Sequence, residues 1–375
     1  MKTLANFRVY RATVADIQKS NILGLTKLLA GEFSDFDIAE DFEAELRKNR
    51  AADPFASNWA KWGFSAPDFF YEDSLVHVAN STLRFQTEKR ERLLPGDVLR
   101  KAIAEEGRNL QDKQEEPLNK KQWAEIKDVV TARLLPKSHI VVKTIPAVMF
   151  QSGKDVLLVI FSSSAKVCED VQSLLRGAFG GWPFYPFTNS YAWPVEGFMT
   201  GILRGDYRHF EAINTVTLFN PDEGAVTYKD QDLTASNEPL QEHLNNHYTV
   251  KKMAFAFHND GNKEGDSYTT MKMDAKGGFS AWKLSDVKDM EAREYGQDGM
   301  LEATEAYDLI FTRDVNSMIG QIDVAMRKLE ADRDTPVQEE ESRDDQIAAA
   351  HLNGTMHIET EQQSEEEDDD ENWEL

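Results

Sequence analysis

Hydrophobic residues over Ser74–Ile103 fall into two short β-prone runs followed by a helical pattern. The runs at 75–78 and 83–85 are rich in Val, Leu and Phe, and Asn80-Ser81 between them is typical of a tight turn. Pro95-Gly96-Asp97 ends the second run, and Asp97 can cap a helix that starts directly afterwards. The stretch predicts a strand, a turn, a second strand and a helix.

A dense run of charge, Glu88-Lys89-Arg90-Glu91-Arg92, is predicted to lie between the second of these strands and the helix. Its three cations are therefore expected on a surface loop at an element boundary. A charged loop is most often simply solvated, but phosphate binding also requires local cations of this kind. The residues alone leave both interpretations open.

The rest of the chain mixes the two hydrophobic periods, which predicts both helices and strands. Strands are predicted over 7–11, 140–150, 155–161, 215–218, 225–228, 250–257, 268–273 and 279–283. Helices are predicted from 13 to about 30 and over 38–48, 98–114, 120–133, 165–176, 195–204 and 314–329. Two passages, 7–85 and 140–185, have the order strand, helix, strand, the second more plainly.

The two helices at 98–114 and 120–133 are separated only by a short polar break at Pro117. Two helices joined in this way project naturally as a finger. One side of the second helix carries four cations, Lys120, Lys121, Lys127 and Arg133, diluted by Glu125 and Asp128.

The charge of the chain is unevenly distributed. Its 375 residues carry a formal net charge of −24, of which 331–375 contribute −15 through 17 acidic and 2 basic residues. The run Ser364–Glu371 has no apolar residue, so this tail is predicted to be disordered. An acidic chain does not bind nucleic acid through bulk charge, although it can carry a basic patch on one face.

The single cysteine, Cys168, excludes an internal disulfide and favours a reducing compartment. It is expected to be a small buried or half-buried residue of an amphipathic helix. No apolar stretch approaches 18 residues and the N-terminus lacks the apolar block of a signal peptide, so a cytoplasmic protein that does not span a membrane is predicted.

Two groups of residues invite a catalytic interpretation and do not support one. His243 and His247 would share a helix face, but HLNNH has Leu where a zinc protease needs its general-base Glu. Four acids, Asp35, Asp37, Asp41 and Glu43, lie on a single polar segment, whereas a two-metal site draws carboxylates from separate elements. With no P-loop, nucleophile elbow or dinucleotide motif, the chain is predicted not to be an enzyme and to need no cofactor or metal.

A collinear series of short motifs resembles the recombination-associated protein RdgC family over residues 5–328. The motifs are HVAN at 77–80 with the charged run and LLP after it, NFRVYR at 6–11, LLPK at 134–137, SSSAKVCEDVQSLL at 162–175 and KDQDLT at 229–234. No single motif is as specific as a metal-ligand spacing, and the resemblance is carried by their common order.

The resemblance implies an α+β protein whose horseshoe-shaped monomers pair at both ends into a ring. The ring of this family holds duplex DNA without sequence preference and obstructs RecA-mediated recombination, which implies a homodimer associated with the nucleoid. Phosphate contacts hold a duplex without reading its bases. The implied parts are an N-terminal α+β part (1–96), the helical finger (97–139), a further α+β part (140–330) and the disordered acidic tail (331–375).

Carried over residue by residue, the resemblance implies DNA contacts at nine positions. They are Lys89, Arg90 and Arg92 of the charged run, Lys120, Lys121, Lys137 and His139 of the finger, and Lys229 and Gln231 of the KDQDLT motif. Three residues depart from the family pattern: Asp230 and Glu116 stand where cations are expected, and His139 stands where the family can have Phe. These departures bear on the strength of DNA binding and on ring closure at the finger.

The acidic tail lies outside the resemblance and ends with an aromatic residue among acids, Glu371–Leu375. It resembles the tails of single-strand-binding proteins, which dock partner enzymes and compete with DNA, and a purely solubilising tail is the alternative. A recombination or replication protein is therefore the expected partner of the tail. The competing hypothesis for the whole chain is an interaction protein that binds a basic partner through its acidic surface, and a salt-titrated assay with duplex DNA separates the two. Preference for single-stranded over duplex DNA is left open.

Overall fold

The computed structural model describes residues 6–20, 36–67, 74–114, 116–231, 233, 236–296 and 300–334. The chain divides into two compact units, Met1–Glu330 and Ala331–Leu375. The fold and the sites below belong to the first unit. The finer division of the chain into an N-terminal part, a finger and a further α+β part stays a prediction.

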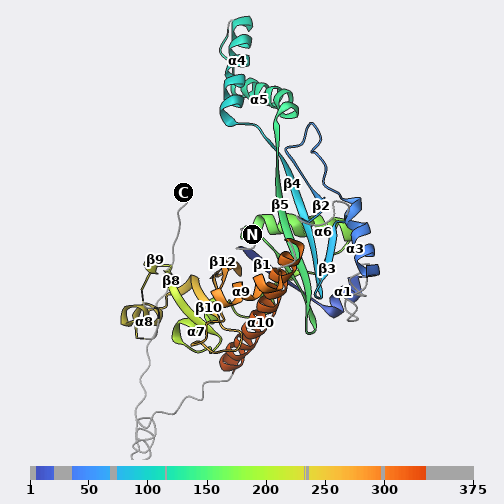
Figure 1. Cartoon of the computed structure of the whole chain (residues 1–375). Helices are drawn as coiled ribbons and strands as arrows, with labels where there is room; N and C mark the ends of the chain where they lie inside the picture. Colours follow the sequence, from blue (N-terminus) through green and yellow to red (C-terminus); the bar gives the residue numbers. More distant parts are fainter. Residues whose placement is uncertain are drawn as a thin grey trace, which may run out of the picture. The chain divides into compact units, whose positions relative to one another are not determined.

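An antiparallel sheet organises the first unit (Figure 1). Its strands, in spatial order, are β2 (Ala60–Ser65), β4 (Thr82–Leu93), β5 (His139–Ser152), β6 (Asp155–Ile160), β1 (Phe7–Thr13), β12 (Gly278–Leu284), β11 (Thr269–Asp274), β10 (Thr249–Phe257), β8 (Phe210–Asn220) and β9 (Gly224–Lys229). Two short strands lie off this path: β3 (Val76–Ala79) pairs with β4, and β7 (Tyr185–Pro186) pairs with β1.

Helices from across the sequence accompany the sheet. They are α1 (Val14–Ser20), α3 (Phe36–Lys48), α4 (Gly96–Gln114), α5 (Lys120–Leu134), α6 (Ala165–Phe179), α7 (Glu196–Arg204), α8 (Glu238–Asn245), α9 (Asp286–Tyr295) and α10 (Met300–Asp334), with the 3-10 turns η2 (Leu135–Lys137) and η3 (Phe187–Ser190). The α+β class is confirmed.

The central strands bury side chains on both faces, as their alternation requires. On β1, Phe7 and Val9 join one hydrophobic cluster, whereas Tyr10 and Ala12 join the other. The first cluster is completed by side chains of α7 and α10, and the second by side chains of α3 and α6. Cys168 lies in the second cluster, where burial raises the pKa of its thiol to about 11, so it is an inert core residue.

Local sequence signals explain several of the elements. Asn80 and Ser81 both have positive φ, 50° and 58°, which confirms the predicted turn between β3 and β4. A capping box of Asn119 and Gln122 starts α5, and the Ser164 side chain accepts from the Val167 N–H at the start of α6.

Other boundaries differ from the predicted ones. Asp97 lies inside the first turn of α4 rather than capping it, because the helix already begins at Gly96. α6 runs past Gly177 to Phe179 and is capped by Gly180, which has the left-handed φ of 70° suited to glycine. α10 begins at Met300, well before the predicted 314. The second half of the helix predicted from 13 to 30 falls on 21–30, outside the described residues.

Candidate nucleic-acid interface

A narrow extension of the sheet, here called the stalk, carries α4 and α5 away from the hydrophobic core (Figure 1). It consists of Glu88–Leu93 of β4, 139–144 of β5 and 60–63 of β2, which are paired side by side. The burial pattern of β5 marks where the stalk leaves the core: residues 145–150 are buried, and the six before them are half-buried or exposed. The cations of the stalk are therefore at least partly accessible on both of its faces, whereas Glu88 is buried.

The charged run Glu88–Arg92 lies inside β4, so its prediction as a loop between strand and helix was wrong. Its strand conformation has a consequence for the three cations, because successive residues of a strand point to opposite faces. Lys89 is on one face, and Arg90 and Arg92 are on the other. The three cations do not form one cluster.

The register adds a cation to each face, since residues directly opposite in antiparallel strands share a face. Lys143 is opposite Lys89, and Lys61 is opposite Arg90. Sequence reasoning missed both lysines. Lys143 stands in a run correctly predicted as a strand, but only the pairing of β4 with β5 reveals that it lies beside Lys89.

On the first face, two lysines share one carboxylate. The Nζ of Lys89 is 3.0 Å from Oε2 of Glu91, and the Nζ of Lys143 is 3.7 Å from the same oxygen. The hydrogen bond from Lys89, helped by the nearby charges, lowers the pKa of Glu91. This face keeps an excess of one positive charge, and 64% of the Lys143 side chain is exposed.

On the second face, the arginines are engaged by the protein itself. The guanidinium of Arg90 bonds the carboxylates of Asp53 and Glu88. Arg92 donates to three backbone carbonyls: those of Pro54 (3.0 Å), Pro136 (3.1 Å) and Leu135 (3.3 Å). Arg92 therefore ties the end of β4 to η2 and to the segment before β2, and its role is structural as well as electrostatic.

The helix pair at the end of the stalk is held by a close contact. A Cβ at Gly107 of α4 would lie 2.3 Å from the ring of Trp123 of α5, so only glycine fits there. Lys120 and Lys121 are exposed in the first turn of α5, which has no acidic residue. Because each helical residue advances about 1.5 Å, they lie roughly 20 Å along the helix from its other end.

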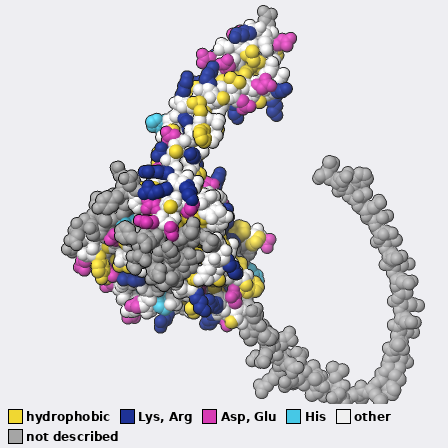
Figure 2. Space-filling view, turned by 90° about the vertical axis from the view of Figure 1, so that its right-hand side faces the viewer, with side chains coloured by type: hydrophobic (Ala, Val, Ile, Leu, Met, Phe, Trp, Pro, Cys, Tyr) yellow, Lys and Arg dark blue, Asp and Glu magenta, His cyan; other side chains and the backbone are white. Residues whose placement is uncertain are grey.

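Exposed Lys137 in η2 and His139 at the start of β5 mark that other end, where α5 returns to the stalk. Figure 2 shows Lys and Arg side chains gathered along the stalk and over the helix pair, interleaved with acids. Seven of the nine predicted contact residues thus belong to one continuous extension of the fold.

Comparison with known proteins gives this extension a family context. The family model described as "Putative exonuclease, RdgC" matches residues 32–328, well over half of the chain. The chain belongs to the RdgC family.

Individual relatives of the RdgC family agree with this assignment. The recombination-associated protein RdgC of Pseudomonas entomophila is 29% identical over 278 residues, covering 73% of this chain and 85% of the relative. That of Pseudomonas fluorescens is 30% identical over 280 residues, covering 73% and 86%. That of Pseudomonas aeruginosa is 30% identical over 224 residues, covering 58% and 71%. The resemblance drawn from the motifs is confirmed.

The remaining two RdgC-derived positions, Lys229 and Gln231, are not near the stalk. Lys229 ends β9, at the opposite end of the strand order from β2 and β4. The Nζ of Lys229 is 4.0 Å from Oδ2 of Asp230, and both side chains are about three-quarters exposed (75% and 73%). Glu116, the other acidic departure from the RdgC pattern, is exposed between α4 and α5.

The residues weighed as catalytic candidates have other roles. The predicted common helix face of His243 and His247 was wrong, because α8 ends at Asn245 and His247 has a φ of 63°. His243 Nδ1 is 2.8 Å from the Tyr228 hydroxyl. Glu43 accepts the Leu75 N–H at 2.9 Å and so anchors the entry to β3. Asp35 and the side chain of Asp37 lie outside the described residues.

Across the ranges that the structure describes, no three His, Cys, Asp or Glu residues are placed to hold a metal ion. Among the described helices, none has the length and apolarity needed to cross a membrane. The RdgC family description names an exonuclease and the relatives' names do not, so the absence of enzymatic activity stays a prediction.

Proposed function

We propose that this RdgC-family chain binds duplex DNA without sequence preference, as a homodimer that encloses the duplex, and thereby obstructs RecA-type recombination on the nucleoid. The observation that carries the proposal is the stalk, which presents cations on two faces outside the hydrophobic core. Such an arrangement contacts phosphates from several directions and does not require insertion into a groove.

The distribution of charge supports the stalk as the DNA-binding element. The described body of the chain is acidic, yet the stalk and helix pair carry many cations, interleaved with acids. Those of the proposed contact surface are Lys61, Lys89, Arg90 and Arg92, which are half-buried, and Lys120, Lys121, Lys137 and Lys143, which are exposed. Some are paired with carboxylates, but ion pairs at exposed sites are worth only about 0–1 kcal/mol. A phosphate can therefore replace the partly exposed Glu91 beside Lys89 and Lys143 at little cost.

Two exposed apolar surfaces support the homodimer. The helix pair exposes 48% of Val98 and 61% of Val129. α9, in the part of the unit that follows the sheet, exposes 47% of Val287, 61% of Met290 and 65% of Tyr295. Pairing of both surfaces with a second copy would bury these side chains and close a ring by two-fold symmetry.

The names of the relatives, recombination-associated proteins, support the place of this activity in recombination. Obstruction follows physically from the proposed geometry. A closed ring on duplex DNA excludes a recombinase filament from the length of DNA that it covers.

The deciding experiment is a salt titration of duplex binding by the native chain and by Lys89→Gln/Lys143→Gln, which removes both cations of one stalk face. The variant neutralises two fewer phosphates than the native chain does. Its binding at low salt should therefore be weaker, and the slope of log affinity against log salt should be shallower by about 2. Lys154→Gln/Lys263→Gln is the matched control, because both of its lysines are exposed and lie outside the stalk.

No binding by the native chain at low salt, or equal slopes for all three proteins, would contradict the proposal. Absent DNA binding together with capture of a basic protein would favour the alternative, an interaction protein on the same fold. Light scattering of the native chain tests the dimer directly, since a mass near 42.6 kDa would correspond to a monomer.

A further inference from the structure

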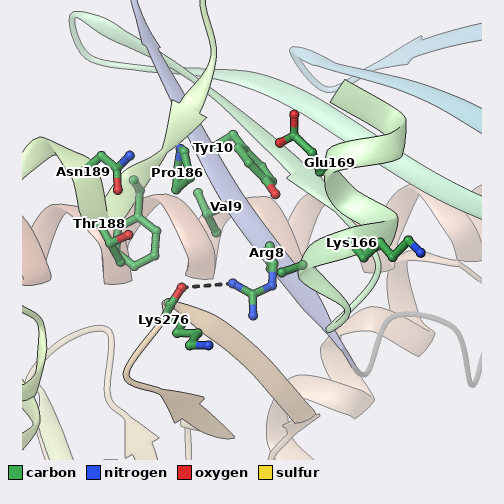
Figure 3. Close-up of a pocket in the computed structure, with 12 residues that line it drawn as sticks. Arg8, Val9, Tyr10, Lys166, Glu169, Pro186, Thr188, Asn189 and Lys276 are labelled. Carbon is green, nitrogen blue, oxygen red and sulfur yellow. Dashed lines mark hydrogen bonds between the residues drawn. The ribbon is translucent and has the colours of Figure 1, made fainter. Parts of the chain in front are cut away.

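A cavity of about 590 Å³ opens beside β1, away from the stalk in the strand order (Figure 3). Its walls come from four separate segments: β1, the first turn of α6, η3, and the turn between β11 and β12. A volume of this size is typical of pockets that hold small organic ligands. None of the predicted DNA contacts lies in its wall.

Three cations from three of those segments line this cavity: Arg8, Lys166 and Lys276. Arg8 is fixed in place, because its Nε donates to the Ser163 carbonyl at 3.2 Å and its Nη1 donates to the Lys276 carbonyl at 2.9 Å. Figure 3 shows the second of these bonds and the Arg8 guanidinium at the centre of the wall. The Asp274 carboxylate, 3.6 Å from Nη2 of Arg8, orients it further.

The two lysines, unlike Arg8, have no side-chain partner within the described residues. Lys166 and Lys276 are exposed, and no contact within the described residues engages either ammonium group. The one acid of the wall, Glu169, is 2.7 Å from Arg176 and so has a cation of its own. In a chain of net charge −24, two exposed, unpaired lysines at the rim of one hollow, beside a fixed arginine, favour an anionic ligand, because a lysine side chain at such a position is free to swing toward it.

The rest of the wall is mostly apolar and includes the side-chain amide of Asn189. Tyr10, Pro186 and Phe187 line one side, with Asn189 beside them. The turn that carries Lys276 is held against η3 by Gly277, whose φ is +71° and where a Cβ would lie 2.5 Å from Thr188. The cavity thus combines a cationic side with an apolar side and has room for more than a bare phosphate ion.

We propose that this cavity binds a nucleoside 5′-monophosphate unit, with the phosphate on the three cations and the nucleoside against the apolar wall. The unit has two sources with the same chemistry, a free mononucleotide and the 5′-phosphorylated end of a DNA strand. The site is separate from the stalk, and the proposal does not depend on the ring described above. Lys and Arg are the side chains that proteins use most to bind phosphate groups.

The first test is calorimetric titration of the native chain with dAMP and with deoxyadenosine. Saturable binding of dAMP, with deoxyadenosine much weaker, is expected. Lys166→Ala/Lys276→Ala should weaken dAMP binding at least tenfold, because each lysine contributes a charged hydrogen bond. Both lysines are exposed, so the variant should fold normally. Lys154→Ala/Lys263→Ala, which leaves the cavity intact, should bind as the native chain does.

Failure of dAMP to saturate at millimolar concentration, or equal dAMP affinity in the two double variants, would overturn the proposal. If the cavity variant proves unfolded by circular dichroism, Asn189→Trp provides the second test, since it fills the cavity from an exposed position without removing a charge. It should also abolish dAMP binding, and unchanged affinity would again overturn the proposal.

The second test identifies the source by competition against dAMP. Competition by a 5′-phosphorylated oligonucleotide, and not by its 5′-hydroxyl counterpart, would assign the cavity to strand ends. Competition by neither would assign it to the free nucleotide. Equal competition by both would overturn the proposal, because the cavity would then be binding internal phosphodiesters.

A closed circular duplex keeps the two proposals apart. It has no strand ends, so the cavity variant should bind it as tightly as the native chain does. The stalk variant Lys89→Gln/Lys143→Gln should lose affinity for it while keeping its affinity for dAMP.

Discussion

Charged side chains form two regions in this protein that differ in burial and in what they hold together. Those of the stalk, apart from the buried Glu88, are half-exposed or exposed, and they pair within β4 or with an adjacent segment. Along α10, three charge pairs are buried or mostly buried and join the helix to distant parts of the chain: Arg11 to Asp323, Arg84 to Asp308, and Lys288 to Asp314. The same chemical pairing is therefore exchangeable in one region and structural in the other.

Burial explains the difference. Lys288 and Asp314 are each only 1% exposed, and the Nζ of Lys288 is 2.7 Å from Oδ2 of Asp314. Water cannot replace either partner there, so loss of one leaves an uncompensated charge. In the stalk, water or a phosphate can replace Glu91 beside Lys89. Four changes test how far this contrast holds, from the largest expected effect to the smallest.

Removing one member of a buried pair should have the largest effect. Asp314→Ala should lower the free energy of unfolding by about 3–5 kcal/mol, because Lys288 remains buried and charged. Urea denaturation measures the loss. The double variant Lys288→Met/Asp314→Leu should recover most of it, and Asp332→Ala, at an exposed position of α10, should cost little. A loss below about 1 kcal/mol for Asp314→Ala would remove the distinction between the regions.

Arg92 is the stalk residue expected to behave as the core charges do. Arg92→Ala removes the donor to the carbonyls of Pro54 and Pro136, whereas that of Leu135 still accepts from Ser138, and should destabilise the chain by about 1–3 kcal/mol. Hydrogen exchange should show the change first at the residues around Pro54 and Pro136. Lys143→Ala, a neighbouring cation without such bonds, should leave exchange at both places unchanged. Equal behaviour of the two variants would make Arg92 a purely electrostatic residue.

Removal of the acidic C-terminal segment should affect the stalk's proposed function and leave the core pairs untouched. Residues 331–375 carry a net charge of −15, and a tethered segment is present at millimolar effective concentration. Truncation after Asp334, which keeps all of α10 and removes a net charge of −14 (15 acidic and 1 basic residue), should raise duplex affinity roughly tenfold at low salt, with a smaller gain as screening increases. Coincident salt curves for the full and truncated chains would leave only partner docking or solubility as roles for the segment.

Glu91→Gln should have the smallest effect, and in the direction opposite to most substitutions. It releases Lys89 and Lys143 and should raise duplex affinity by roughly threefold, with the free energy of unfolding nearly unchanged. The native chain should approach the variant only at acidic pH, because the lowered pKa keeps Glu91 ionised until pH falls below the usual range of Glu. Glu264→Gln is the control, and an equal gain there would show a general effect of net charge.

The sequence predicted local structure well wherever a local signal decides it. Asn80-Ser81 specifies its turn and the run 140–161 specifies its hairpin through residues that are neighbours in the chain. The charged run Glu88–Arg92 was misplaced because its strand conformation depends on pairing with β2 and β5, and EKRER has no apolar alternation to indicate it. The family resemblance located most cations of the stalk, yet their division between two faces and the addition of Lys61 and Lys143 required the register.

The register of the stalk also determines how easily the stalk bends. β4 and β5 pair without interruption from Thr82 opposite Phe150 to Leu93 opposite His139, whereas the pairings of β10 with β8 and of β11 with β12 contain irregularities. A ladder with no slipped residue has no hinge along its length. The helix pair is therefore joined to the core by a continuous antiparallel ladder rather than by a flexible linker. A force on α4 and α5 would be transmitted along β4 into the core, where Arg84 of β4 pairs with Asp308 of α10.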